Sequence, residues 1–217
     1  VLKSLVDLKN IKENNSLIKA LAYQLYENNG VLKREQVSEY LKNLEQRERK
    51  ILRELGVKFG RYHVFLHQLI KPEPVSLRTL LWKNFHQKFH NLKPPTFGLN
   101  FLDDQEKRNK NFMLLCGFEK FDSFFVRIDI LERLFVLIIN SSTKENAEIK
   151  IVPEMLNLLG CSKDNFKKLL TKMNYKVFEK NEESYIKYTP VKKFRKISTK
   201  KVSDENPFKI LKNLNLN

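Results

Sequence analysis

The spacing of apolar residues predicts helices through most of the first half of the chain. Leu17, Leu21 and Leu25 recur at helical spacing, and Ser16 before them is of a type that caps helix N-termini. Such repeated stripes are typical of a packed helical unit. Further helices are expected over 37–44, 51–55, 64–69 and 74–85, the last with Leu77, Leu80, Leu81 and Phe85 facing inward.

The pattern changes after residues 94–110, which hold two prolines, a glycine and the charged run DDQEKRNK. Residues 124–128 alternate as in a short strand. Asp129 and Glu132 have the spacing of a capping box ahead of the apolar residues 130–138. A strand followed by a central helix is therefore expected in the second half.

Residues 152–188 show the order helix, turn, helix, hairpin. One helix begins at Pro153, a tight turn follows, and Ser162 caps a second helix. Two β-prone runs, 175–178 and 185–188, come next. This order predicts a winged-helix-like unit in which the second helix would be the recognition helix.

The predicted fold class is mainly α, with a helical bundle-like unit followed by a winged-helix-like α+β unit and a disordered basic tail. No internal repeat is predicted. The expected boundaries are 1–95 for a helical accessory unit, 96–110 for a linker, 111–190 for the winged-helix-like domain, and 191–217 for the flexible tail with its apolar patch NPFKIL.

Charge points to a polyanionic partner, RNA or DNA. The formal net charge is +16, although lysine outnumbers arginine 31 to 10, which is also what an AT-rich genome produces at solvated positions. The distribution is more informative, because residues 163–201 hold 13 Lys and Arg against four Asp and Glu. The excess of positive charge therefore gathers on the predicted recognition helix and the tail.

The polar face of that helix predicts contact with phosphates rather than readout of a base sequence. Its side chains are mainly ammonium groups, and Asp164 among them would repel a phosphate. The alternative is a solvated face without a ligand. The candidate contact residues are Lys163, Asn165, Lys167, Lys168 and Lys172, of which Asn165 is the one suited to a base edge.

The tail segment PVKKFRKISTKK has basic residues and no acidic one, which predicts disorder and phosphate contact, or else a solubilising role. Phe194 is suited to stacking on a base of a single strand. The basic candidates here are Lys192, Lys193, Arg195, Lys196, Lys200 and Lys201.

Several kinds of chemistry find no support in the sequence. None of the six glycines precedes a lysine, so a phosphate-binding P-loop is excluded and no catalytic residue is proposed. The pairs HVFLH and HQKFH lack the glutamate of a zinc-protease motif, so no metal site is expected. Cys116 and Cys161 are expected to be buried thiols in a cytoplasmic protein, and no membrane span is expected.

Several segments together resemble the C-terminal, non-motor region of the alphaproteobacterial helicase-related proteins, superfamily 2 relatives of the mitochondrial RNA-degradosome helicase. They are ALAYQLYENNGVLKRE, LGVKFGRYHVFL…LIKP…LRTLLW, VRIDILERL and VPEMLNLLGCS with the basic helix and NYKV after it. His67 stands where that family usually has a proline. The chain begins at Val1 without Met, as expected of a fragment.

The resemblance implies a parent protein with two RecA-like motor domains that unwinds RNA or DNA with ATP. ATP and Mg are expected only in those motor domains, which would be partners within the same polypeptide, and no cofactor is expected in this chain. A freestanding DNA-binding regulator and a scaffold that braces the motor are the alternatives. Motif positions whose role the sequence leaves open are Arg61, His63, Lys71, Arg78 and Trp82.

Overall fold

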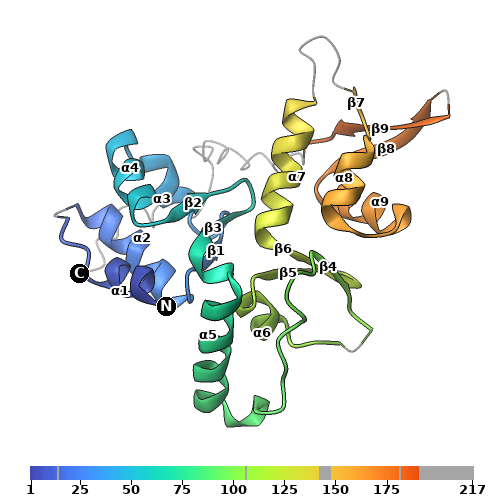
Figure 1. Ribbon diagram of the computed structural model, residues 1–217. Helices are drawn as coiled ribbons and strands as arrows, with labels where there is room; N and C mark the ends of the chain where they lie inside the picture. Colours follow the sequence, from blue (N-terminus) through green and yellow to red (C-terminus); the bar gives the residue numbers. More distant parts are fainter. Residues whose placement is uncertain (14, 106, 142–147, 181, 191–217) are drawn as a thin grey trace, which may run out of the picture.

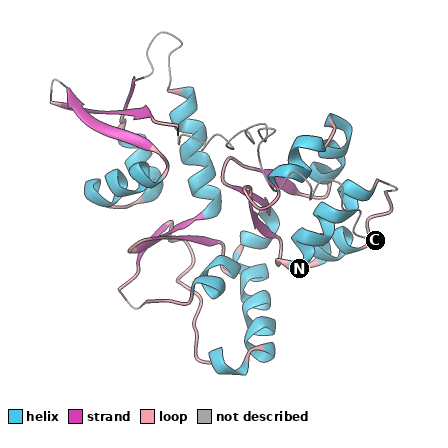
Figure 2. Ribbon diagram, turned by 180° about the vertical axis from the view of Figure 1, so that it is seen from behind, coloured by secondary structure: helices cyan, strands magenta, loops and turns pink. Residues whose placement is uncertain are grey.

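The computed structural model describes residues 1–13, 15–105, 107–141, 148–180 and 182–190 (Figures 1 and 2). About 50% of them are helical and 20% are in strands, which form three small antiparallel sheets. The prediction of a mainly α fold is therefore wrong, and the fold is a mixture of α and β. The predicted basic tail lies outside the described residues. Within the described ranges, no helix is both long and apolar enough to cross a membrane.

The chain contains three repeats of one order of elements. The full order, helix–strand–helix–helix–strand–strand, occurs in the first and the third. In each case the first strand pairs with the third and the third with the second. The first repeat comprises α2 (Ser16–Glu27), β1 (Val31–Lys33), α3 (Ser38–Asn43), α4 (Gln46–Glu54), β2 (Val57–Phe59) and β3 (His63–Leu66), with α1 (Lys3–Lys9) packed on α2. The third repeat comprises α7 (Ile128–Asn140), β7 (Glu148–Lys150), α8 (Pro153–Leu159), α9 (Lys163–Lys172), β8 (Tyr175–Lys180) and β9 (Glu183–Tyr188).

A shortened form of this order lies between the two. No helix is described between β4 and α6, where the other repeats have one, but the sheet again has the order β4-β6-β5. Strand β4 falls inside the predicted linker, so that segment is part of a sheet. This middle repeat follows η1 (His67–Ile70) and comprises α5 (Pro72–Phe85), η2 (Gln87–Phe89), β4 (Phe101–Asp103), α6 (Lys110–Leu115), β5 (Phe118–Phe121) and β6 (Phe124–Arg127).

The repetition corrects the prediction that the chain has none, and a short sequence signal accompanies it. In all three repeats a residue with positive φ separates the last helix from the hairpin. These residues are Gly56 (φ 91), Gly117 (φ 85) and Asn174 (φ 67), in LGVKF, CGFEK and MNYKV. Glycine and asparagine tolerate this left-handed conformation, so the turn is encoded locally while the surrounding residues differ.

The apolar run HVFL was predicted as part of a helix, and it is instead strand β3. A short apolar run fits a buried strand as well as a buried helix, and here β3 is the central strand between β1 and β2. All four of its residues are buried. Val64 belongs to the core of the first repeat, whereas Phe65 packs with Val31 and Ile128 on the other side.

Helix α5 is present, but it buries a different face from the one predicted. Leu80, Leu81 and Phe85 are 52%, 51% and 83% exposed. The buried face instead carries Val75 and Arg78. Apolar residues occur on several sides of this helix, so their spacing alone does not identify the face that packs on η1 and α6.

Helix α7 connects the repeats, because it directly follows β6. Figure 1 shows it (yellow) between the first repeat and the helices of the third. Phe124 and Val126 of β6 belong to the same core as Leu134 of α7 and Phe166 of α9. The middle sheet therefore packs against the third repeat, and the three repeats share continuous apolar contacts.

Candidate nucleic-acid interface

Helix α9 has the capping and burial that its sequence predicts. The Ser162 side chain accepts a hydrogen bond from the Asn165 amide. Phe166, Leu169 and Leu170 are buried. The lysines therefore lie on the outer face of the helix, as expected for a stripe of this period.

Several of the predicted contact residues are engaged within the protein. Lys167 Nζ lies 3.0 Å from a Glu179 carboxylate oxygen, and Lys172 Nζ lies 2.6 Å from Asp122. The Asn165 side chain donates to Asp103 at 3.2 Å, so its amide is not directed at a base edge. Asp103 and Asp122 belong to the middle repeat, so part of the predicted recognition face contacts a neighbouring repeat.

Two predicted contact residues remain available on α9. Lys168 is exposed and has no ion pair or hydrogen bond from its side chain to any described residue. Lys163 is exposed too, and it adds to the effect of Lys167 in lowering the pKa of Glu179. The predicted tail residues, Lys192, Lys193, Phe194, Arg195, Lys196, Lys200 and Lys201, lie outside the described part of the chain.

A cluster of charged side chains joins all three repeats around His63, which is 2% exposed. Its Nε2 lies 3.0 Å from Glu119 of β5, and its Nδ1 lies 3.6 Å from Glu132 of α7. Lys33 of β1 contacts the other oxygen of Glu119 at 2.5 Å. We call these four residues the junction cluster.

The junction cluster shifts the pKa values of two of its members. Burial acts to lower the pKa of His63, but Glu119 and Glu132 outweigh it and raise that pKa above its ordinary value. Burial acts to raise the pKa of Glu119, but His63 and Lys33 outweigh it and lower that pKa. Both shifts favour the charged forms, so the cluster is an ion-pair network at mildly acidic pH.

Glu132 also binds the hairpin turn of the first repeat. Its carboxylate accepts hydrogen bonds from the backbone amides of Arg61, Tyr62 and His63, at 2.5 to 2.9 Å. The predicted capping box is therefore wrong, because α7 has Arg127 at its N-cap without a side-chain cap and Glu132 reaches a different repeat. A Cβ on Gly60 would overlap the Glu132 carboxyl group, so this close approach requires glycine.

A cleft of about 860 Å³ opens beside the junction cluster, and we call it the junction cleft. Its lining includes Arg34 and Arg61 of the first repeat, Lys120 of the middle repeat and Lys172 of the third. Lys120 and Lys172 are paired with Asp104 and Asp122. Three sequence-distant segments thus supply cations to one concave surface.

Arg34 and Arg61 are the guanidinium groups of this cleft without a carboxylate partner in the described ranges. Arg34 donates to the Gly60 carbonyl at 2.6 Å. Arg61 is exposed, lies over the Phe135 ring at 5.9 Å and contacts the Tyr188 hydroxyl at 3.4 Å. Guanidinium groups held in this way retain donors suited to phosphate oxygens.

The remaining motif positions, Arg78, Trp82 and Lys71, contribute to the packing and capping of α5. Arg78 is 3% exposed and donates to the carbonyls of Asn29 and Leu69 at 2.6 and 2.5 Å, so it fastens α5 to the first repeat. Burial lowers its pKa to about 10, which leaves it charged at neutral pH. Trp82 stacks on Phe89 at 5.4 Å. Lys71 is the N-cap residue of α5.

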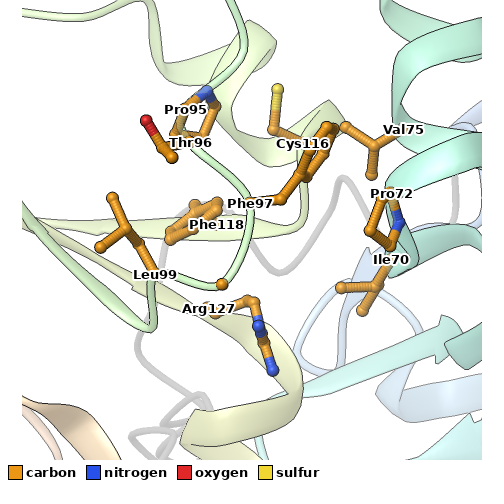
Figure 3. A pocket seen from close by; sticks show the side chains of 11 residues that line it. Ile70, Pro72, Val75, Pro95, Thr96, Phe97, Leu99, Cys116, Phe118 and Arg127 are labelled. Atoms are coloured by element: carbon orange, nitrogen blue, oxygen red, sulfur yellow. The ribbon is translucent and has the colours of Figure 1, made fainter.

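The pocket in Figure 3 carries no comparable chemistry. It lies between the start of α5, residues 95–99 and β5, and its volume is about 50 Å³, which is small for an organic ligand. Burial raises the pKa of the Cys116 thiol in its wall to about 12, so that thiol is unreactive at neutral pH. No group of three or more His, Cys, Asp or Glu in the described ranges is placed to hold a metal ion.

The histidine pairs do not form the helical metal site that their spacing suggests. His63 lies in β3, and His67 lies in η1 and is exposed. His86 is the C-cap residue of α5, where its ring lies 4.5 Å from that of Trp82. A helical site at this spacing needs both imidazoles on one continuous helix, and neither pair lies on one.

Sequence reasoning did not identify Arg34 as part of the junction cleft, or Glu119 and Glu132 as part of the junction cluster. Arg34 and Glu132 stand in segments that carry the family resemblance, but those segments do not indicate which charges meet. The three residues come together because the end of β1, β5 and α7 converge. Comparisons of the chain with models of protein families, with curated proteins and with solved structures gave no match. The resemblance to helicase-related proteins therefore stays a prediction.

Proposed function

We propose that this chain is a nucleic-acid-binding accessory region that holds RNA or DNA through its phosphates and performs no reaction itself. The observation that supports this most directly is the junction cleft, where Arg34 and Arg61 have no carboxylate partner within the described ranges. Lys163 and Lys168 of α9 are exposed as well and add positive charge to the third repeat. Contacts of this kind are independent of base sequence and weaken steeply with salt.

The parent protein in this proposal is a cytoplasmic, ATP-dependent superfamily 2 helicase, of which the chain would be the portion after the motor domains. The motif LGVKFGRYHVFL…LIKP…LRTLLW supports this part of the proposal. ATP and Mg would bind in the motor domains. The role of the accessory region would be to hold a strand near the motor.

The test is a fluorescence-anisotropy titration of the chain with a labelled single strand and a labelled duplex over a salt series. Wild type is expected to bind at low salt with a steep slope of log K against log salt. The double variant Arg34→Gln/Arg61→Gln is expected to reduce the magnitude of that slope by about two, one for each guanidinium group that no longer neutralises a phosphate. The matched control is Arg47→Gln/Lys50→Gln, which removes two exposed charges from α4.

If the control variant binds as weakly as the double variant, the binding reflects attraction by net charge and not a specific role of the junction cleft. No binding of either nucleic acid at low salt would reject it. That second result would favour a scaffold, for which the contacts of Lys172 with Asp122 and of Asn165 with Asp103 already provide a rationale, since they tie α9 to the middle repeat.

A further inference from the structure

The sheet of the third repeat has an outer face that points away from the core. Side chains alternate across a strand, and Tyr175, Val177 and Ile186 face the core of the third repeat. Their neighbours therefore face outward, and the register places them in cross-strand rows. The outer sheet face consists of Glu148, Lys150, Lys176, Phe178, Lys180, Glu183, Tyr185 and Lys187.

Two aromatic rings stand side by side on this face. Phe178 and Tyr185 are directly opposite each other, with ring centroids 6.1 Å apart and planes inclined by 20°. Both side chains are half-buried, so part of each ring is open to solvent. Near-parallel rings on an open sheet are suited to stacking with the unpaired bases of a single strand.

The charges around the rings are mainly positive. The two glutamates are already in ion pairs, Glu183 with Lys150 and Glu148 with Lys180, the latter at 3.7 Å. Lys176 and Lys187 lie directly opposite each other, both exposed and without an ion pair to any described residue, and Glu148 of β7 lies opposite Lys187 on its other side. Like charges in this position repel, so an anion placed between them is favourable.

We infer that the outer sheet face binds single-stranded nucleic acid, with bases stacked on Phe178 and Tyr185 and phosphates beside Lys176 and Lys187. The inference rests on the proposed function, because both require nucleic acid, and it adds the strand type and a second contact surface. A duplex keeps its bases paired in the interior, so it gains the lysine contacts but not the stacking. The outer sheet face therefore discriminates between the two strand types, whereas the junction cleft does not.

The experiment compares wild type with Phe178→Leu/Tyr185→Leu, using a labelled oligothymidine and a labelled duplex at one low salt concentration. Leucine preserves apolar bulk on the strands and removes the rings. The dissociation constant for the single strand is expected to rise about tenfold or more, and that for the duplex to stay within about twofold. Tyr23→Leu is the matched control, because Tyr23 is 55% exposed on α2 in the first repeat.

A second variant keeps the test valid if the leucine variant folds poorly. Phe178→Trp places an indole on the face, and its fluorescence is expected to be quenched by the oligothymidine beyond the response of wild type, which contains a single tryptophan, Trp82. Absence of that additional quenching would overturn the stacking inference. Equal weakening of single-strand and duplex binding in the leucine variant would overturn it as well.

The results also distinguish this inference from the proposed function. If wild type binds neither nucleic acid, the proposed function itself fails. If wild type binds both and the leucine variant binds both unchanged, only the outer sheet face is rejected. Weaker binding by Lys176→Gln/Lys187→Gln without any effect of the ring substitutions would indicate a purely ionic surface, which also contradicts stacking.

Discussion

The hairpins of the first and third repeats have the same place in the element order and opposite environments. In the turn of the first, the amides of Arg61 and Tyr62 donate to Glu132, and His63 next to them is 2% exposed. The hairpin of the third repeat presents exposed lysines on its outer face, at positions 176, 180 and 187. The hairpin of the first repeat contacts another repeat, whereas that of the third repeat has an exposed outer face.

The two hairpins show that the place of an element within the fold does not decide its role. Position alone assigns nucleic-acid contact to α9, yet three of its five candidate side chains contact carboxylates of the protein. The neighbouring repeat determines which faces remain available. A test of function therefore has to compare matched positions in different repeats.

The largest effect is expected from Glu132→Ala. The substitution leaves three backbone amides without their acceptor and removes the carboxylate 3.6 Å from His63 Nδ1, which is expected to lower the free energy of unfolding by about 3 kcal/mol. Urea denaturation measures this change. Glu183→Ala, in the hairpin of the third repeat, is the control and is expected to leave the midpoint unchanged; similar destabilisation in both variants would remove the contrast between the hairpins.

A smaller destabilisation, about 2 kcal/mol, is expected from Gly60→Ala, because the added methyl group occupies the position of the Glu132 carboxyl group. The double variant Gly60→Ala/Glu132→Ala makes this test specific. Its destabilisation is expected to be less than the sum of the two single effects, since alanine at 132 vacates the space. Additive effects would show that alanine at position 60 acts through the backbone conformation and not through a clash with the Glu132 side chain.

The junction cluster predicts a pH dependence of stability. The contribution of His63, whose pKa is raised on folding, is fully present below its ordinary value of 6.5 and is lost as pH rises through the raised value. The contribution of Glu119, whose pKa is lowered, is present above its ordinary value of 4.5 and is lost as pH falls through the lowered value. The free energy of unfolding should therefore decrease as pH rises above about 6.5, the ordinary pKa of His63.

His63→Gln is expected to flatten this decrease, which denaturation at several pH values measures. His67→Gln is the control, because His67 is exposed in η1. An unchanged pH slope in the His63 variant would assign the dependence to other groups.

The smallest effect is expected for binding at α9. Lys168→Gln is expected to weaken binding to a labelled strand about two- to threefold and to reduce the magnitude of the salt slope by about one. Lys50→Gln is the matched control, because Lys50 is an exposed lysine of α4, which has the place in the first repeat that α9 has in the third. Equal effects of the two substitutions would mean that the third repeat has no special part in binding.

Local signals predicted much of the secondary structure of the third repeat. Ser162 caps α9 as expected, and the runs at 175 and 185 are strands β8 and β9. The strands of the first repeat, in contrast, are only three to four residues long, and β3 is buried on both faces. A strand without polar alternation leaves no period of two, so the first repeat was mistaken for a helical bundle.

Neighbouring residues and composition are enough to specify the Ser162 cap of α9, the left-handed turns at Gly56, Gly117 and Asn174, and the concentration of lysine toward the end of the chain. Which charges remain unpaired depends instead on the packing of the repeats against one another. Ion pairs such as Lys172 with Asp122 join residues 50 positions apart, and their energies depend on distance and burial that no local pattern contains. The junction cluster therefore depends on how the three repeats pack together, and the outer sheet face on the pairing of β7, β8 and β9.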